Sequence, residues 1–217
     1  PSDSSRGNKN CKRMTPVSHT PKVSIVIPWH FMENWEFFLG RCLKSIEKQS
    51  FKDYEIILTK AGSMPVNTNR AIKAAEGELI KVLYMDDYLT DHTSLGNMVS
   101  HFQEDSKWLV TACVHDNGET VGNYHKPSYN DQIHTGKNTI GSPSVLMMRK
   151  DSLMFFDEKL SWLLDCDLYS RLYAMYGEPT IVEEPDVVIG LHPGQTSNLM
   201  SDEDKLKEKA YIEKKYE

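Results

Sequence analysis

The chain lacks several features that would assign its class at once. It has no apolar run near the roughly 20 residues that a membrane helix needs, so we expect no transmembrane segment. Its N-terminal stretch has no hydrophobic core of the kind found in secretory signal peptides. No C-x-x-C pair suggests zinc, and the four cysteines are scattered (Cys11, Cys42, Cys113 and Cys166). We therefore expect reduced thiols and a cytoplasmic location, with attachment to a membrane surface left open.

The chain also lacks an excess of positive charge. The 217 residues carry a formal net charge of -6, which argues against a broad nucleic-acid-binding face. The segment "PWHFMENWE" is neither glycine-rich nor basic, so it does not provide the triphosphate loop that a nucleotidyltransferase needs. The remaining composition, with 39% hydrophobic and 26% charged residues, is typical of one globular domain with a substantial core.

The first half of the sequence alternates between strand and helix patterns. Within the first helical pattern, Phe38, Cys42 and Ile46 form an apolar stripe at four-residue spacing. Strand, helix, strand, helix and strand are expected in that order (22–28, 35–48, 54–59, 67–77 and 78–85). This alternation predicts an α/β fold with a mostly parallel central sheet flanked by helices.

The second half is less regular. We expect a helix, a strand, a long loop, a strand, a helix, and a strand running into a loop (95–105, 107–116, 117–138, 143–151, 163–177 and 185–198). Residues 1–21 are rich in Ser, Asn, Lys and Pro and are expected to be flexible. Residues 201–217 open with an S-x-x-D capping pattern and predict a charged helix. A single domain over 22–200 would contain the whole sheet.

Two adjacent carboxylates follow the third strand, in "LYMDDYLTD". Asp86 and Asp87 are placed where a buried strand ends, and ligands of parallel sheets bind beyond the carboxyl ends of the strands. Carboxylate oxygens suit Mg²⁺ or Mn²⁺, which complete their shells with water and substrate phosphates. The alternative is a solvated turn or a cap for the helix that follows. Position favours the first interpretation without excluding the second.

Several segments in order resemble family 2 glycosyltransferases of the GT-A fold. "VSIVIP" is similar to the opening strand of that family, and "FLGRCLKSIEKQSFKDYEIIL" to its first helix and second strand. "NRAIKAAEGELIKVLYMDD" resembles the segment that leads into the DXD metal motif, and "FDEKLSWLLDCDLYSRL" the acceptor-side segment with the catalytic base. The resemblance covers about Val23 to Ser197, with spacing compatible throughout.

The resemblance implies an inverting enzyme that transfers a sugar from a nucleotide-diphosphate sugar, UDP-linked in the first instance, to an acceptor hydroxyl. Mn²⁺ or Mg²⁺ would assist, with Asp86 and His192 as the matching metal ligands. By position, the donor nucleotide would contact a larger set (Pro28, Lys60, Gly62, Asn69, Arg70, Met85 and Asp86). For His192, which follows the apolar run "VVIGL", a purely structural role is the alternative.

The sequence departs from the family pattern at two positions. The first aspartate of DXD falls on Tyr84, which leaves one carboxylate fewer near the metal. The family's "DDGS" reads "KAGS" here, so the aspartate that contacts the nucleotide base is replaced by Lys60. Lysine cannot accept a hydrogen bond from a uracil N–H, although it could approach a phosphate or a base carbonyl.

On the acceptor side, the resemblance places the general base at Asp165. A carboxylate there would remove the proton of the acceptor hydroxyl. Asp167 lies two residues further along the same expected helix and so points elsewhere. The alternative makes Asp165 a first-turn residue stabilised by the helix dipole. Gly141, Ser142 and Trp162 match the acceptor-side segments.

Two rival functions remain at this point. A non-catalytic relative that binds a sugar or a partner is consistent with Tyr84 and Lys60, and a nucleotidyltransferase ranks below it. The acceptor is open among a glycan, a lipid-linked sugar, a protein and a modified nucleic acid, and the oligomeric state is unknown.

Overall fold

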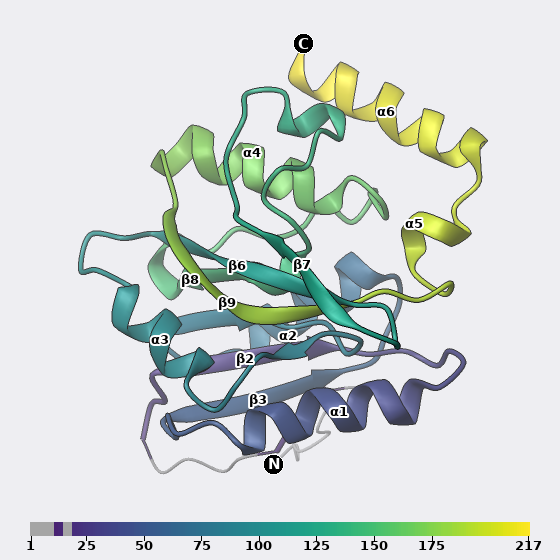
Figure 1. The fold of residues 1–217 in the computed structure, drawn as a ribbon. Helices are drawn as coiled ribbons and strands as arrows, with labels where there is room; N and C mark the ends of the chain where they lie inside the picture. Colours follow the sequence, from purple (N-terminus) through teal and green to yellow (C-terminus); the bar gives the residue numbers. More distant parts are fainter. Residues whose placement is uncertain (1–10, 15–18) are drawn as a thin grey trace, which may run out of the picture.

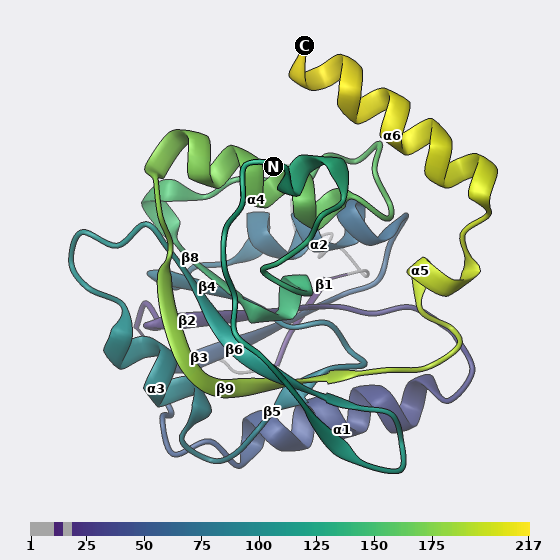
Figure 2. The same cartoon turned by 45° about the horizontal axis from the view of Figure 1, so that its top comes forward.

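A mixed β-sheet with helices on both faces forms the molecule (Figure 1). The computed structural model describes residues 11–14 and 19–217. Its sheet has the strand order β1-β3-β2-β4-β8-β6-β9-β5, and β7 pairs with β6 off this path. Helices α1 and α3 cover one face and α2 and α4 the other (Figure 2).

The first half folds as expected. The strands are β2 (Val23–Pro28), β3 (Tyr54–Thr59) and β4 (Leu79–Val82), and the helices are α1 (Trp35–Glu47) and α2 (Met64–Ala74). β2 pairs in parallel with both β3 and β4, which confirms the predicted parallel arrangement. All residues of β2 and β3 are buried, as expected for strands covered on both faces.

The second half is mixed rather than parallel. It contains β5 (Tyr88–Leu89), α3 (Ser94–His101), β6 (Trp108–Asp116), β8 (Leu146–Arg149), and β9 (Thr180–Gly190). β6 runs parallel to β9 but antiparallel to β8, and β5 is antiparallel to β9. The α/β class with helices on a central sheet is confirmed, and parallel pairs occur in both halves, β2 with β3 and β4 in the first and β6 with β9 in the second.

Two expectations about irregular segments need correction. The long loop expected over 117–138 contains strand β7 (Val121–His125), which pairs antiparallel with β6, and a 3₁₀ turn at Ile133–Thr135. β7 carries no apolar alternation because most of its residues are exposed. In the expected flexible segment 1–21, Cys11–Arg13 form strand β1 against β3. Residues 1–10 and 15–18 of that segment lie outside the described residues.

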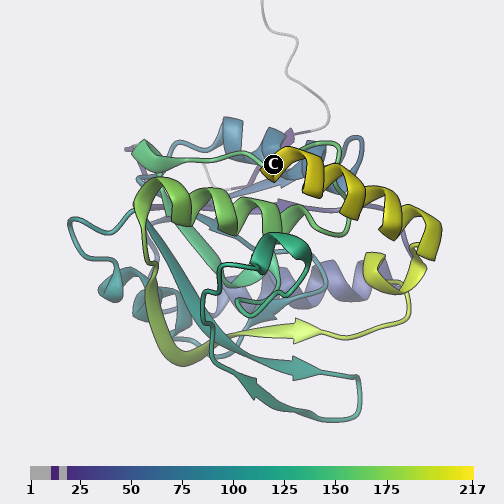
Figure 3. The same ribbon diagram turned by 90° about the horizontal axis from the view of Figure 1, so that it is seen from above.

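The C-terminal part lies beside the start of α4 (Leu164–Tyr176) (Figure 3). A short helix, α5 (Thr196–Leu199), precedes α6 (Asp202–Tyr216). The expected S-x-x-D cap is present, because the Ser201 hydroxyl accepts a hydrogen bond from the Asp204 N–H at 3.1 Å. Among the helices of the described residues, none is both long enough and apolar enough to cross a membrane.

Candidate functional site

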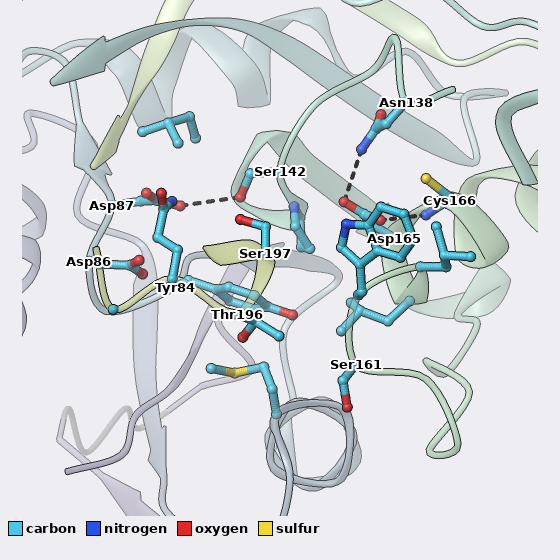
Figure 4. Close-up of a pocket in the computed structure, with 18 of the residues that line it drawn as sticks. Tyr84, Asp86, Asp87, Asn138, Ser142, Ser161, Asp165, Cys166, Thr196 and Ser197 are labelled. Carbon is cyan, nitrogen blue, oxygen red and sulfur yellow. Dashed lines mark hydrogen bonds between the residues drawn. The ribbon is translucent and has the colours of Figure 1, made fainter. Parts of the chain in front are cut away.

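A pocket of about 250 Å³ opens beyond the carboxyl ends of the central strands. Asp86 reaches it from the turn after β4, His192 from the segment after β9, and Asp165 from the first turn of α4. Asp86 and Asp165 lie on opposite sides of the pocket (Figure 4). Tyr84, Ser142, Trp162 and residues of α5 also line it. The fold therefore brings the predicted metal ligands and the predicted base to one cavity.

Asp86 and His192 form a pair at one side of the pocket. The His192 Nε2 lies 3.0 Å from a carboxylate oxygen of Asp86. The histidine ring packs at a tilt against Phe38, with 4.8 Å between ring centroids. Both side chains keep some exposure, 11% for His192 and 21% for Asp86. The imidazole, packed against Phe38 of α1, and the partly exposed carboxylate therefore lie in direct contact at the wall of the pocket.

The backbone of Asp86 is fixed by α1 and β9. The Arg41 guanidinium donates to the Asp86 carbonyl at 2.7 Å and to the Asp116 carboxylate at 2.6 Å. Gly190 leaves room for this arrangement, since a Cβ there would lie 2.4 Å from the same carbonyl oxygen. The turn is thus held from two directions, and Asp86 can face the pocket without relying on its own side chain for position.

Asp87 has a framework role. It is 3% exposed and accepts hydrogen bonds from the Gly190 N–H at 2.9 Å and the Ser142 hydroxyl at 3.3 Å. Burial raises the pKa of its carboxyl, and the neighbouring charge of Asp86 adds to that effect. Its two oxygens tie the turn after β4 to β9 and to the segment before β8. Both aspartates line the pocket, and Asp86 is the more exposed of the two.

A metal would find two protein ligands here. Among the described residues, no group of three or more His, Cys, Asp and Glu side chains is arranged to hold a metal ion. Tyr84 at the first DXD position supplies no carboxylate, and burial raises the pKa of its phenol above the ordinary value. Mg²⁺ is commonly held by one or two carboxylates together with substrate phosphates and water. Asp86 and His192 fit such a cation, with most of its shell supplied by the donor.

Asp165 is held at the other side of the pocket. One carboxylate oxygen accepts the Cys166 N–H at 2.7 Å, and the other accepts the Asn138 side-chain amide at 2.9 Å. Burial raises the pKa of Asp165 to about 6, although both hydrogen bonds oppose the rise by favouring the charged form. A carboxylate with this pKa is ionised at neutral pH and is still basic enough to accept a proton.

Asn138 was missed by sequence reasoning. Its amide donates to Asp165 and to the Gly141 carbonyl, while its own oxygen accepts the backbone N–H groups of Ile140 and Gly141 at 3.0 and 2.9 Å. Gly141 has a φ of +121°, which favours glycine. The Asn-x-x-Gly spacing is a turn signal that could have located this residue, although not its partner.

Asp167 points away from the pocket, as expected. It has no exposed area and bonds to Arg171 at 2.8 Å, Lys215 at 2.7 Å and the Tyr216 hydroxyl at 3.1 Å. It therefore joins α4 to α6. The geometry separates the two aspartates as the helical spacing predicts, whereas the assignment of Asp165 as the base stays a prediction.

Apart from Asp86, none of the predicted donor residues lines this pocket. Asn69 is 3% exposed, and its amide bonds to the backbone N–H and carbonyl of Phe156 at 2.8 and 2.9 Å, which fixes that loop. The Lys60 ammonium lies 2.9 Å from the centroid of the Phe31 ring and 4.8 Å from that of Trp29. Pro28 ends strand β2, and Met85 lies in the turn after β4. Gly62 lies in the bend before α2, and Arg70 lies on that helix.

Of the predicted acceptor residues, all but Gly141 line the pocket. Ser142 and Trp162 line the pocket together with Asp165. Gly141 contributes its carbonyl, which accepts hydrogen bonds from Asn138 at 3.0 Å and from the Tyr169 hydroxyl at 3.3 Å. Gly141 does not line the pocket, and its carbonyl connects the segment before β8 to Tyr169 of α4.

Comparison with known proteins shows the fold. No protein-family model matches the chain. It is 24% identical over 221 residues to WcaA of Escherichia coli (strain K12), described as a colanic acid biosynthesis glycosyl transferase, covering 82% of this chain and 76% of WcaA. S. aureus TarS 1-349 in complex with UDP-GlcNAc has a TM-score of 0.64 at 20% identity, covering 88% of this chain.

A third relative comes from another source. The Pyrobaculum calidifontis mannosyltransferase PcManGT, solved with GDP-Man and Mn²⁺, has a TM-score of 0.56 at 14% identity, covering 83% of this chain and 59% of that one. The chain spans 65% of the TarS 1-349 chain and 42% of TarS. At these identities the likeness establishes architecture, and the chain has the GT-A fold of glycosyltransferases.

Proposed function

We propose that the protein is an inverting glycosyltransferase, of the family 2 type, that transfers a sugar from a nucleotide-diphosphate donor to an acceptor hydroxyl. The observation that carries the proposal is the placement of Asp86 with His192 opposite Asp165 across one pocket. Such an arrangement separates a site for the leaving diphosphate from a site for proton removal. The likeness to glycosyltransferases supports it.

On the donor side, Asp86 and His192 would hold Mn²⁺ or Mg²⁺ together with the diphosphate. When bound, such a cation neutralises the charge that develops on the departing phosphate. The Arg41 contact with the Asp86 carbonyl and the Asp87 contact with Gly190 keep this turn in place. The chain itself therefore supplies a preorganised carboxylate and does not have to reorganise it during the reaction.

On the acceptor side, Asp165 would accept the proton of the attacking hydroxyl. The acceptor oxygen forms a bond to the anomeric carbon from the face opposite the nucleotide. The bond from that carbon to the diphosphate oxygen breaks, and the nucleoside diphosphate leaves with the electron pair. The proton stays on Asp165 until it passes to solvent, and configuration is inverted because there is one displacement.

The donor nucleotide is suggested by the ligands of the solved relatives and by the residue at Lys60. TarS was solved with UDP and UDP-GlcNAc, and PcManGT with GDP-Man. We take a UDP sugar as the first candidate because TarS, which shares the fold of this chain, was solved with UDP and UDP-GlcNAc. Lys60 cannot accept the uracil N–H, so backbone groups would have to read the base. The cytoplasmic location belongs to the same proposal.

A panel experiment tests the proposal. UDP-GlcNAc, other UDP sugars and GDP-mannose are offered with Mn²⁺ and with EDTA, and release of nucleoside diphosphate is measured with candidate acceptors. We expect release from at least one donor with Mn²⁺ and loss of that release with EDTA. Binding of nucleotide without release under every condition would instead support the non-catalytic relative, which Tyr84 at the first DXD position favours.

A further inference from the structure

The carboxylate of Glu208 on α6 binds the backbone at the start of α4. It accepts hydrogen bonds from the N–H groups of Ser161 at 2.6 Å, Trp162 at 3.0 Å and Leu163 at 3.0 Å. Glu208 is 7% exposed, although α6 is otherwise a charged helix with few buried residues. A buried carboxylate with three backbone donors is a specific connection between two segments 45 to 47 residues apart.

The segment that Glu208 holds forms part of the pocket. Ser161, Trp162 and Leu163 all line it, and Asp165 follows within the first turn of α4. Backbone N–H groups at the start of a helix have no partner within the helix and attract anions. Glu208 binds the three N–H groups that lie directly before this first turn, whereas the carboxylate of Asp165 accepts the Cys166 N–H within the turn and the Asn138 amide.

Further contacts fix α6 against the same region. Lys215 bonds to Asp157 at 2.6 Å and to Asp167 at 2.7 Å. The Tyr211 hydroxyl donates to Asp157 at 2.8 Å, and the Tyr216 hydroxyl bonds to Asp167 at 3.1 Å. These contacts position α6 independently of Glu208, so a change at Glu208 can be separated from undocking of the helix.

We propose that Glu208 is a positioning residue for the acceptor side of the pocket. Through Ser161–Leu163 it fixes the indole of Trp162 and the direction of Asp165, and α6 thereby completes the site. The existence of this connection does not depend on the proposed function. Its effect on sugar transfer does rest on that function, and the experiment is arranged to distinguish the two.

The test uses the full chain with Glu208→Gln, which keeps the shape of the side chain. The amide nitrogen of glutamine cannot accept a hydrogen bond, so part of the connection is lost. Glu213→Gln, an exposed position on the same helix, is the matched control. We measure hydrogen exchange at 161–163 and the resonances of the Trp162 indole and the Asp165 carboxyl. We also measure UDP binding by calorimetry and turnover of the donor that the wild type consumes.

We expect exchange at 161–163 to accelerate roughly 10- to 100-fold in Glu208→Gln, since the lost bonds involve a charged acceptor. Both resonances should shift, turnover should fall about tenfold or more, and UDP affinity should stay within about twofold. Glu213→Gln should match the wild type.

Three results would overturn the inference. Exchange equal to the control would remove the connection itself. Unchanged resonances or unchanged turnover, despite faster exchange, would remove the positioning role. If the wild type consumes no sugar nucleotide, the proposed function fails, and exchange with the two resonances still decides the role of Glu208.

Glu208→Gln could undock α6 as a whole, which exchange along α6 would show. In that case Glu208→Asp, which keeps the carboxylate, should restore slow exchange at 161–163 in part. No restoration would also overturn the inference.

Discussion

The donor and acceptor sides of the pocket are held in different ways. On the donor side, Asp86 lies on a short turn between buried strands, and its backbone is fixed by Arg41 of α1 and by Gly190 of β9. On the acceptor side, Asp165 begins a helix and is held by single side chains, Asn138 from a turn and Glu208 from α6 acting through the preceding segment.

This difference teaches which side depends on the packed core. The donor turn inherits its position from close packing, which tolerates little displacement. The acceptor side depends on a few hydrogen bonds across segments far apart in the sequence. We therefore expect substitutions of residues that hydrogen-bond to Asp165, such as Asn138, to disturb the acceptor side without unfolding the protein. Four predictions test this contrast.

The largest expected effect separates Asp165 from Asp167. Asp165→Asn keeps the shape but removes the proton acceptor, so turnover should fall by about 10²- to 10⁴-fold while UDP affinity stays within about twofold. Asp167→Asn should retain most turnover but lose roughly 1–3 kcal/mol of stability, because Lys215 and Arg171 lose a buried charged partner. Steady-state kinetics and thermal unfolding measure both. A dead Asp167→Asn with an active Asp165→Asn would reverse the assignment.

The two variants should change the free energy of unfolding in opposite directions at neutral pH: Asp167→Asn should lower it and Asp165→Asn should raise it. The pKa of Asp165 is raised from 3.8 to about 6 in the fold, so ionising it costs folding free energy at neutral pH. The stabilisation of Asp165→Asn relative to the wild type should be fully present above about pH 6 and should vanish as pH falls below about 4. Thermal unfolding between pH 4 and 8 checks the sign, which fails if the variant is the less stable protein at pH 7.

The second prediction addresses the donor side. Asp86→Ala removes a carboxylate whose side chain bonds to His192, while the turn stays fixed through its backbone. We expect Mn²⁺ to strengthen UDP binding to the wild type, and this gain to fall about 100-fold in Asp86→Ala with little change in thermal stability. Calorimetry with and without Mn²⁺ measures it, with the exposed Asp105→Ala as control. Equal Mn²⁺ dependence in both variants would exclude Asp86 as a ligand.

On both sides of the pocket, the sequence predicts the features whose signals are local. Strand β3 was expected over the observed residues, and Asp86 was found because it directly follows an apolar run. The first turn of α4 was placed by its helical pattern, which also separated Asp165 from Asp167. Periodicity and motif order report contacts within a few residues, and these features need nothing more.

The supports of the site could not be read in this way. Arg41 lies 45 residues from Asp86, and Asn138 lies 27 residues from Asp165. Glu208 looks like one more charge on a solvated helix until α6 is placed against α4. Strand β7 was missed for a related reason, since its pairing with β6 leaves its side chains exposed and without alternation. Such partners are fixed by topology rather than by local pattern.

The third prediction concerns pH. The proposed base must be ionised, so turnover should rise with pH through about 6 and level off above it. The Asn138 amide stabilises the ionised form of Asp165. Its removal in Asn138→Ala should raise the pKa and move the acid limb upward by about one pH unit. Asn130→Ala is the control, because the Asn130 amide donates to the Lys137 carbonyl and to Thr139 rather than to Asp165. An acid limb at the same pH in all three proteins would contradict the role of Asn138.

The smallest expected effect lies at the edge of the donor side, at Lys60. Its ammonium rests against the rings of Phe31 and Trp29, where the family pattern has an acidic base-reading residue. Lys60→Asp supplies an acceptor for the uracil N–H, so affinity for UDP should rise relative to CDP, whose base has no ring N–H, by roughly fivefold, the value of one hydrogen bond. Lys73→Asp is a matched control, because Lys73 also lies over an aromatic ring, that of Phe155, at 5.3 Å. Competition calorimetry with UDP, CDP and dTDP gives the three affinities for each protein. If their ratios in Lys60→Asp equal those of the wild type and of Lys73→Asp, Lys60 does not read the base, and selectivity on the donor side belongs to the backbone that the packed strands hold in place.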